Sequence, residues 1–443
     1  MRTAQGLIVS NFLKAHWRAR TLHANSLTRF QDIRARTVMA FARAHSDYHR
    51  GRLAPYSDGQ WREVPPIGKP EMMADFGAYN TANVGLEEAM ATALHAETNR
   101  DFTPTVRGLT VGLSSGTSGH RGLFLVHPRE QAAWAGLMLA RVLPGLRLKG
   151  YRVALFLRSN SNLYERLGSK WLSFRYFDLM MTLEQAIERL NEYRPDILVG
   201  PPSLLGFLAD ARENGALRHS PLKLISAAEV LEPQDRARLE SVFQQQVHQI
   251  YQCTEGLMAV SCKCGRLHIQ EDLVAMQLEP VPSETDVASP RFVPIVTDLW
   301  RATQPIIRYR MNDILTMDVR ACPCGSGFRV IDRIEGRSDD ILYFHSLAGG
   351  LRPFFPDTIR RMALLASDGI TDYRAFQCEP GELTLHLATS PNAFDNCALA
   401  ARQTVQQTLA EYECRPANLS IEHGLAARMP DKKRRRVQRL YEV

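Results

Sequence analysis

The sequence predicts an α/β protein with a large N-terminal domain of mixed and parallel sheets flanked by helices, and a small C-terminal α+β domain. The chain has 443 residues, whereas a single hydrophobic core rarely serves more than about 250 to 300 residues. From residue 151 onward, β-rich runs alternate with helical segments, which is typical of a parallel sheet covered on both faces. After residue 335, strands and helices are mixed in a shorter unit. We therefore expect domains at 1–335 and 336–443.

The expected elements follow this division in order. Residues 1–100 predict several helices with a basic surface, because Arg, Ala and Leu recur at helical spacing. The alternating region contains the strands "YRVALFL", "RYFDLM", "DILVG", "LKLISAA" and "QVHQIYQ" and the helices "LEQAIERLNEYR", "SLLGFLADAREN" and "PQDRARLESVF". Next come the short β segments "VPIVTDL", "PIIRYR", "ILTMDV" and "FRVIDRI". The last unit has a helix from Pro356, the strands "DYRAFQ" and "ELTLHLA", a helix through "ALAARQTVQQTLAEY" and the strand "NLSIE".

Composition narrows the class of protein. Hydrophobic residues make up 45% and charged residues 23% of the chain, as in soluble globular enzymes and scaffolds. No apolar run approaches the roughly 18 residues that span a bilayer, and the N-terminus has no sustained apolar stretch. We therefore expect a cytoplasmic protein without a membrane span. The formal charge of +7 suits anionic small molecules, coenzyme phosphates, an acidic partner or nucleic acid.

The stretch "GLSSGTSGHRG", residues 112–122, indicates a phosphate-binding loop. Its small residues permit close approach of the backbone to a ligand, and its glycines permit turns that point several N–H groups at one anion. It is not a Walker loop, because His120 and Arg121 stand where that motif has Lys and Ser or Thr. The flanking runs "LTVGL" and "GLFLVHP" predict strands, so we expect a hairpin-type connection. The alternative is a solvated Ser/Gly linker.

Polar residues follow several of the predicted strands, at the edge of the sheet where ligands bind in parallel α/β folds. Thr254 and Glu255 come directly after "HQIYQ", where a carboxylate can hold Mg²⁺ and a hydroxyl can contact phosphate. Glu229 follows "LISAA", and "PPS" after "DILVG" begins a helix whose N-terminus can receive an anion. Further along, "RYRMND" contains Asp313, suited to ribose hydroxyls, and "EGRSDD" contains Arg337, suited to phosphate or ribose.

Two short cysteine clusters indicate a metal site. "CKCGRLH" offers Cys262, Cys264 and His268, and "CPCG" offers Cys322 and Cys324. Tetrahedral zinc takes four N or S ligands, commonly from two short knuckles, and each cluster contains the glycine that such a turn needs. Without a secretory signal, close cysteine pairs favour metal over disulfides. Reduced cysteines packed as small apolar side chains are the alternative.

The order of the motifs "LSSGTSGHRG", "YQCTEG", "RYRMND", "RIEGRSDD" and "DKKRRRV" resembles the adenylate-forming superfamily. Within it, the chain resembles the branch of phenylacetate-CoA ligase and coenzyme F390 synthetase. The resemblance implies an acetyl-CoA synthetase-like fold and an AMP-producing acid-thiol ligase. An aromatic or fatty carboxylic acid and ATP would form an acyl-adenylate and pyrophosphate. The thiol of CoA, or of a carrier protein's phosphopantetheine arm, would then take the acyl group.

The same resemblance implies roles for individual residues. A lysine of the C-terminal domain would offset charge as carboxylate and α-phosphate approach. Lys433 matches it best, with Lys432 as the alternative. The nucleotide would be bound by Ser114, Ser115, Gly116, Thr117, Gly119, Tyr251, Thr254, Asp313 and Arg337, with Mg²⁺ on Glu255, the domain hinge at Asp339, and a structural Zn²⁺ on Cys262, His268, Cys322 and Cys324, Cys264 being the alternative ligand.

Two departures from the family pattern leave other functions open. His120-Arg121 replaces the lysine that commonly follows the phosphate loop, and Lys432 replaces the glycine before the terminal lysine. A degenerate homologue that binds an adenylate without transferring it is therefore one alternative. Another is a zinc-stabilised nucleic-acid-binding protein that uses the basic run "DKKRRRVQR" and the Arg-rich helices. The lack of interleaved aromatic residues in that run disfavours nucleic acid.

Overall fold

The computed structural model describes residues 3–114, 121–145, 147, 149–157, 172–281, 290–425 and 435–442. It divides into two compact units. The first comprises Met1–Leu278, Pro294–Met311 and Met317–Asp332, and the second Glu279–Val293, Asn312–Thr316 and Arg333–Val443. The predicted domain boundary at 335/336 is not tested by this division, because the second unit also takes in two earlier segments. Among the described residues, no helix is both long and apolar enough to cross a membrane.

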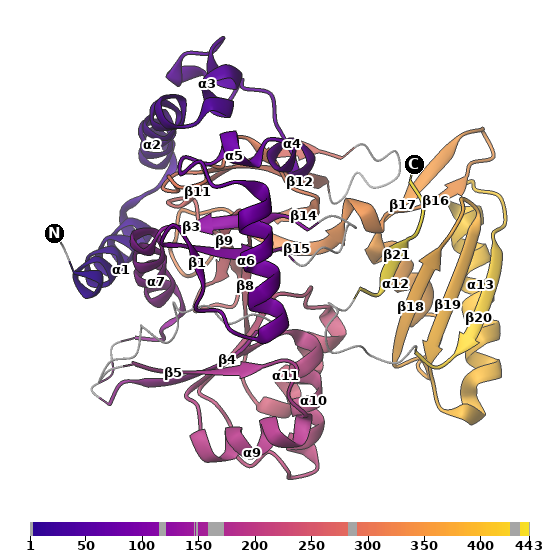
Figure 1. The fold of residues 1–443 in the computed structure, drawn as a ribbon. Coiled ribbons are helices and arrows are strands. Elements are labelled where there is room, and N and C mark those ends of the chain that lie inside the picture. Colours follow the sequence, from indigo (N-terminus) through magenta and orange to yellow (C-terminus); the bar gives the residue numbers. More distant parts are fainter. Residues whose placement is uncertain are drawn as a thin grey trace. The chain divides into compact units, whose positions relative to one another are not determined.

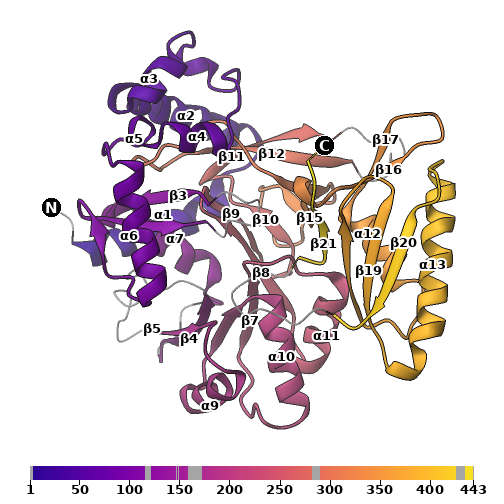
Figure 2. The same ribbon diagram turned by 45° about the vertical axis from the view of Figure 1, so that its right-hand side comes forward.

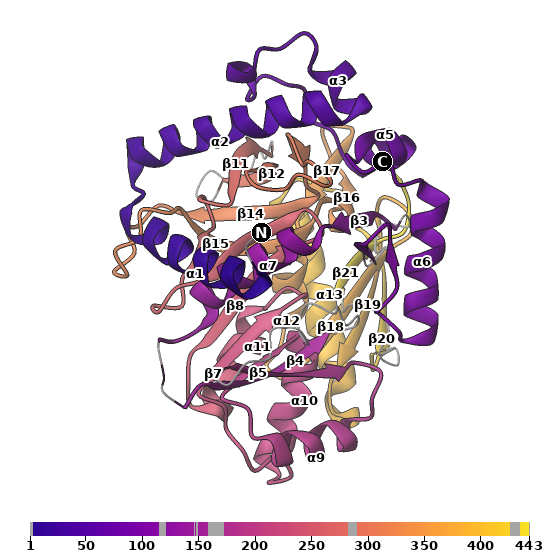
Figure 3. The ribbon, with the colours of Figure 1, turned by 60° about the vertical axis from the view of Figure 1, so that its left-hand side comes forward.

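Helices dominate the first hundred residues, as the sequence predicts (Figure 3). The run Ala35, Met39 and Ala42 on one face of the second helix is buried against Leu299 and Ile307. Apolar residues at this spacing stabilise the helix by burying one of its faces. The first helix packs against α7 (Pro128–Val142). The helices of this segment are α1 (Ala4–Thr21), α2 (Ala24–His45), α3 (Asp47–Leu53), α4 (Lys69–Ala74), α5 (Phe76–Tyr79) and α6 (Leu86–Asn99).

The parallel part of the main sheet has the strand order β8-β7-β6-β4-β5. Figure 2 labels β8, β7, β4 and β5 of this part. All four residues of β6 are buried, as expected for a strand covered on both faces. Helix α9 directs Ala186 and Leu190 into the same core as Phe156. The strands are β4 (Tyr151–Leu157), β5 (Leu172–Asp178), β6 (Ile197–Gly200), β7 (Lys223–Ala227) and β8 (Val247–Cys253), and the helices are α9 (Leu183–Tyr193), α10 (Pro202–Glu213) and α11 (Pro233–Phe243).

After β8 the sheet becomes antiparallel. The next strand, β9 (Gly256–Ser261), pairs back on β8, so the residues between them form a tight turn at the carboxyl end of β8. The predicted strand "PIIRYR" is reduced to β13 (Tyr309–Arg310). The remaining strands of the sheet are β10 (Leu267–Ile269), β11 (Val274–Pro280), β12 (Arg291–Asp298), β14 (Asp313–Asp318) and β15 (Val330–Arg337).

The hairpin expected around the Ser/Gly loop is confirmed. Strands β2 (Leu109–Leu113) and β3 (Leu123–Val126) are antiparallel, with Leu113 opposite Leu123, and β1 (Thr105–Val106) pairs with β2. Together with α6 they enclose a small separate core that contains Leu109, Leu123 and Leu125. The loop thus starts and ends on two strands that are fixed by burial.

The C-terminal part of the second unit is the expected small α+β structure (Figure 1). Its sheet has the order β20-β19-β18-β21, and inward-facing leucines of β19 alternate with half-buried residues. Strand β21, after the basic run, pairs in parallel with β18 and was not predicted. The elements are β16 (Leu342–His345), β17 (Leu351–Phe354), α12 (Pro356–Leu364), β18 (Asp372–Gln377), β19 (Glu382–Ala388), α13 (Phe394–Glu411), β20 (Asn418–His423) and β21 (Val437–Arg439).

Candidate functional site

The turn between β8 and β9 presents the predicted Mg²⁺ ligand. Glu255 is only 7% exposed, and its Oε2 accepts a hydrogen bond of 2.9 Å from the hydroxyl of Thr254. Tyr309 also hydrogen-bonds the Glu255 carboxylate, and burial together with this charge raises the pKa of the phenol. Tyr309 therefore stays a neutral donor. The result is an oriented, shielded carboxylate of the kind that binds a hard divalent cation.

Arg301 holds the backbone of this turn. Its guanidinium donates to the carbonyl of Thr254 (2.6 Å) and to the carbonyl of Leu125 on β3 (3.2 Å). The backbone N–H of Arg301 donates in turn to Asp298, whose pKa is raised by burial. Sequence reasoning missed both Arg301 and Tyr309. Tyr309 stands inside the motif "RYRMND", whereas no local pattern marks Arg301.

The stem of the Ser/Gly loop is closed by Ser114. Its N–H donates to the carbonyl of Gly122, and its hydroxyl accepts from the N–H of Gly122, both at 2.7 Å. Arg121 forms an ion pair of 2.6 Å with Glu97, so its charge is already balanced within the protein. The side chain of Lys69 runs beside the stem, next to Gly122. The predicted ligands Ser115, Gly116, Thr117 and Gly119 lie outside the described residues.

The sequence also predicts ligand contacts at this edge of the sheet for Tyr251 and for the helix N-terminus after "DILVG". Tyr251 is buried on β8, opposite Ala259, three residues before Thr254. The helix N-terminus after "DILVG" does not offer an open anion site, because the N–H of Ser203 already donates to the carboxylate of Glu229 at 3.2 Å. That helix end is thus capped by the protein's own acidic side chain.

The second unit contains the residues predicted for ribose and for the hinge. Arg337 lies 3.9 Å from Asp313, measured from Nε to Oδ1, so the two motifs that contain them come together. Asp339 accepts a hydrogen bond of 3.0 Å from the amide of Asn312. The segment 312–316 is therefore tied directly to the predicted hinge. Lys432 and Lys433 lie outside the described residues.

Four side chains of the first unit converge as a candidate metal site. The ligand atoms of Cys262, His268, Cys322 and Cys324 all lie within 4.8 Å of one another. The Sγ atoms of Cys262 and Cys322 are 3.7 Å apart, and Cys324 Sγ is 3.5 Å from His268 Nε2. A tetrahedral zinc with bonds of about 2.3 Å to sulfur and about 2.0 Å to nitrogen separates its ligands by about 3.5 to 3.8 Å. The Cys262–Cys322 and Cys324–His268 separations match those of such an ion.

Local backbone geometry explains why these cysteines converge. Gly265 and Gly325 adopt φ angles of +73° and +82°, which residues with a side chain rarely tolerate. Each closes a knuckle by donating its N–H to the carbonyl of Cys262 or Cys322, three residues earlier. Cys264 is outside the converging group. Its N–H instead donates to the sulfur of Cys262 at 3.3 Å.

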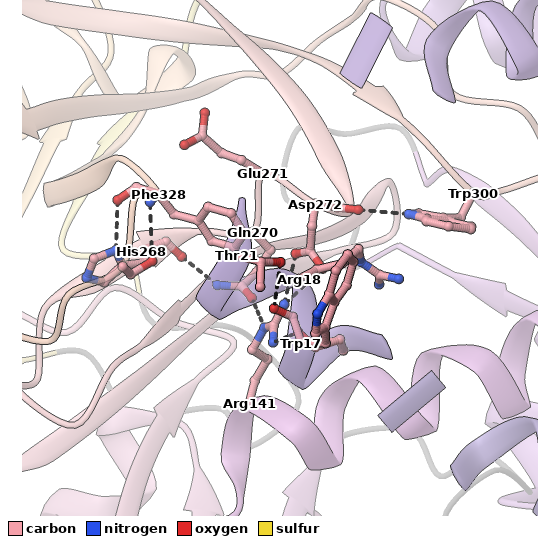
Figure 4. Close-up of polar contacts among 12 residues, drawn as sticks. Trp17, Arg18, Thr21, Arg141, His268, Gln270, Glu271, Asp272, Trp300 and Phe328 are labelled. Carbon is pink, nitrogen blue, oxygen red and sulfur yellow. Dashed lines mark hydrogen bonds and ion pairs between the residues drawn. The ribbon is translucent and has the colours of Figure 1, made fainter. Parts of the chain in front are cut away.

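Contacts around His268 orient its ring. Nδ1 lies 2.8 Å from the carbonyl of Phe328, which places the proton on Nδ1 and leaves Nε2 free to bind a metal (Figure 4). The carbonyl of His268 accepts from Gln270, and Gln270 accepts from Arg141. Arg141 also forms an ion pair of 2.9 Å with the buried Asp272. The metal site is therefore continuous with a buried polar network.

Comparisons with known proteins identify the fold. Neither the protein-family models nor the curated proteins searched match the chain. A solved structure of 2-hydroxyisobutyryl-CoA ligase in complex with R3-HIB-AMP matches 95% of this chain and 91% of its own, at 18% identity and a TM-score of 0.68. Another, of that ligase with 2-HIB-AMP and CoA, matches 95% and 91%, at 19% identity and 0.55. An acyl acid amido synthetase, GH3.15, matches 90% and 86%, at 13% identity and 0.55.

These likenesses confirm the predicted fold class. The chain has the mixed α/β fold of these solved structures, with a large mixed sheet flanked by helices and a small C-terminal α+β structure. At this level of identity the likeness concerns the fold alone. The finer resemblance to the branch of phenylacetate-CoA ligase stays a prediction.

Proposed function

We propose that the protein activates a carboxylic acid with ATP and transfers the acyl group to the thiol of CoA. In the first step a carboxylate oxygen attacks the α-phosphorus and pyrophosphate leaves. In the second step the thiolate sulfur attacks the acyl carbonyl and AMP leaves. The observation that carries the proposal is the shielded Glu255 carboxylate, oriented by Thr254 and Tyr309 at the carboxyl end of β8 in a fold of this class.

Each predicted site residue would bind a part of the substrates that its charge or hydrogen-bonding groups suit. Mg²⁺, when bound, offsets negative charge on the phosphates, and Glu255 would hold it while Thr254 contacts the α-phosphate. Asp313 and Arg337 would bind the ribose, and Asp339 would serve as the hinge. The phosphate loop, with Ser114, Ser115, Gly116, Thr117 and Gly119, would bind the β- and γ-phosphates through backbone N–H groups. Lys433 would stabilise the charge that develops when the two anions meet.

The proposal includes a structural zinc on Cys262, His268, Cys322 and Cys324. The ligand spacing and the orientation of His268 support it. All four coordination positions are supplied by the protein, so no position remains for a reactive water. A zinc here would stabilise the fold and take no part in the transfer reaction. The same ligands support the finer placement in the phenylacetate-CoA ligase branch.

The choice of CoA as the acyl acceptor is supported by the solved structures that share this fold. A 2-hydroxyisobutyryl-CoA ligase with an acyl-AMP and CoA shares this fold, which favours CoA over a carrier protein's phosphopantetheine. An acyl acid amido synthetase also shares it, so an amine acceptor belongs in the test. The acid is expected to be aromatic or fatty. Phe156 is 1% exposed and packs on Phe177 within the core, so it does not line an open pocket for the acid.

Binding to nucleic acid is less well supported. Several arginines of the N-terminal helices are engaged inside the protein and cannot serve phosphates. Arg18 pairs with Asp272, Arg34 donates to the carbonyl of Leu299, and Arg52 donates to the carbonyl of Ile307. The degenerate homologue differs from the ligase only in turnover, which the following experiment measures.

The test is acid-dependent hydroxamate formation with ATP, Mg²⁺ and hydroxylamine over a panel of 2-hydroxyisobutyrate, benzoate, phenylacetate and decanoate. Hydroxylamine traps any acyl-adenylate, whichever acceptor is natural. We expect pyrophosphate and hydroxamate with at least one acid, and thioester when CoA replaces hydroxylamine. Nucleotide binding without pyrophosphate release for every acid would favour the degenerate homologue instead.

A further inference from the structure

Trp300 and Arg301 lie between the metal site and the Glu255 turn. The indole Nε1 of Trp300 donates to the carbonyl of Asp272 at 2.8 Å (Figure 4). The backbone N–H of Trp300 donates to the carboxylate of Asp298 at 2.7 Å. The same carboxylate accepts a hydrogen bond from the backbone N–H of Arg301. Arg301 then reaches the carbonyl of Thr254. The chain of contacts is unbroken.

The other end of this chain is anchored in the metal site. Asp272 is fully buried and receives Arg18 (2.8 Å) and Arg141 (2.9 Å). Arg141 donates a hydrogen bond to the side chain of Gln270, which in turn donates to the carbonyl of His268. Buried networks of this kind restrain their members, because displacing one group leaves its partner unpaired.

The indole ring is fixed on its face as well as at its edge. The guanidinium of Arg34 lies 3.8 Å from the ring centroid of Trp300, and that of Arg18 lies 5.0 Å from it. Arg34 also donates to the carbonyl of Leu299 at 2.9 Å. Backbone and side chain of Trp300 are thus both restrained, although the residue is 38% exposed.

We propose that Trp300 and Arg301 are positioning residues that transmit the rigidity of the metal site, through Gln270, Arg141 and Asp272, to the Thr254–Glu255 turn. The metal site thereby sets the affinity for Mg·ATP, although none of its residues contacts the nucleotide. This inference rests on the proposed function for its nucleotide, but the coupling it describes is a property of the first unit alone.

The experiment measures Mg·ATP affinity by calorimetry together with zinc content. Arg301→Gln should weaken binding by about tenfold or more, and Trp300→Phe, which keeps the ring but loses Nε1–H, by about threefold to tenfold. Both should retain zinc. Trp61→Phe is the control, because its Nε1 also donates a hydrogen bond, here to the carboxylate of Asp32 at 3.1 Å within the helical segment. It should bind Mg·ATP like the wild type.

A double-mutant cycle tests the transmission itself. Gln270→Leu breaks the link between His268 and Arg141, and its effect on Mg·ATP affinity should fall short of additive with that of Trp300→Phe. Additive effects would show two independent contributions and would overturn the inference. Unchanged affinity in Arg301→Gln and Trp300→Phe would overturn it as well.

Hydrogen exchange of the amides in residues 253–256 separates this inference from the proposed function. Exchange should accelerate in Trp300→Phe and Gln270→Leu but not in Trp61→Phe, with no nucleotide present. If the wild type binds no Mg·ATP, the proposed function fails. Accelerated exchange would then still support the coupling, and unchanged exchange would overturn it.

Discussion

The candidate metal site and the Glu255 turn lie in the same unit but are built in different ways. The metal site takes its cysteines from two short knuckles, each closed by its own glycine, so most of its geometry is local. Glu255 is oriented by Tyr309, and its turn is held by Arg301, from segments about 50 residues away in the sequence. A locally built site should be lost or kept as a whole. A site built at long range should lose function in steps.

Loss of a knuckle cysteine should have the largest effect. Cys322→Ser removes one of four ligands, so we expect zinc to fall from one per chain to none and the free energy of unfolding to drop by more than about 5 kcal/mol. Metal analysis and denaturant unfolding measure the two changes. Cys264→Ser should keep both zinc and stability. Retention of zinc by Cys262→Ser together with its loss in Cys264→Ser would assign the ligand to Cys264 instead.

Glu255→Gln should have the next largest effect, on activity alone. The neutral amide cannot replace a carboxylate on Mg²⁺, so we expect hydroxamate formation to fall on the order of a thousandfold. The melting temperature should stay close to that of the wild type, because the amide keeps the size and much of the hydrogen bonding. Glu192→Gln, at an exposed carboxylate on α9, is the control and should leave activity unchanged. An active Glu255→Gln enzyme would remove this residue from the metal-binding role.

Asp272→Asn tests the network that joins the two sites. Two arginines share this buried carboxylate, and its neutralisation leaves both without a counter-charge. We expect a loss of about 3 kcal/mol in the free energy of unfolding, measured with urea. Asp210→Asn removes an exposed partner of Arg238 and should cost less than about 1 kcal/mol. Equal losses in the two variants would mean that the buried network contributes little.

The smallest expected effect is a pH dependence in the helical segment. Burial, with a further contribution from Arg52, lowers the pKa of His49 to about 3, and its ring lies 4.7 Å from that of Tyr79. The unfolded chain binds a proton near pH 6.5 and the folded chain does not, so stability is present above pH 6.5 and is lost as pH falls toward 3.

At pH 5 the loss from His49 should be about 2 kcal/mol relative to pH 6.5 and above. His49→Phe should show a shallower decline between those pH values, measured by urea unfolding. The difference between the two proteins isolates His49, because burial also lowers the pKa of His248, to about 4, in both. Parallel pH profiles would mean that His49 is already protonated in the folded chain.

Much of the fold and part of the sites follow from short-range patterns. Alternating strands and helices predict the parallel sheet, and the flanking β-rich runs predict the hairpin around the Ser/Gly loop. The two knuckles and His268 predict the metal cluster, because a few residues and a left-handed glycine suffice to shape each knuckle. These features depend on neighbours in the sequence, which is why the sequence by itself determines them.

Other features exist only because distant segments meet. No pattern marks Arg301 as the support of Thr254, and none foretells that Glu229 caps helix α10 or that β21 pairs with β18. Hydrogen bonds and ion pairs between distant residues depend on the packing that brings their atoms within about 3 Å. Packing is decided by the whole tertiary structure, so the supports of the Glu255 turn and its connection to the metal site were visible only there.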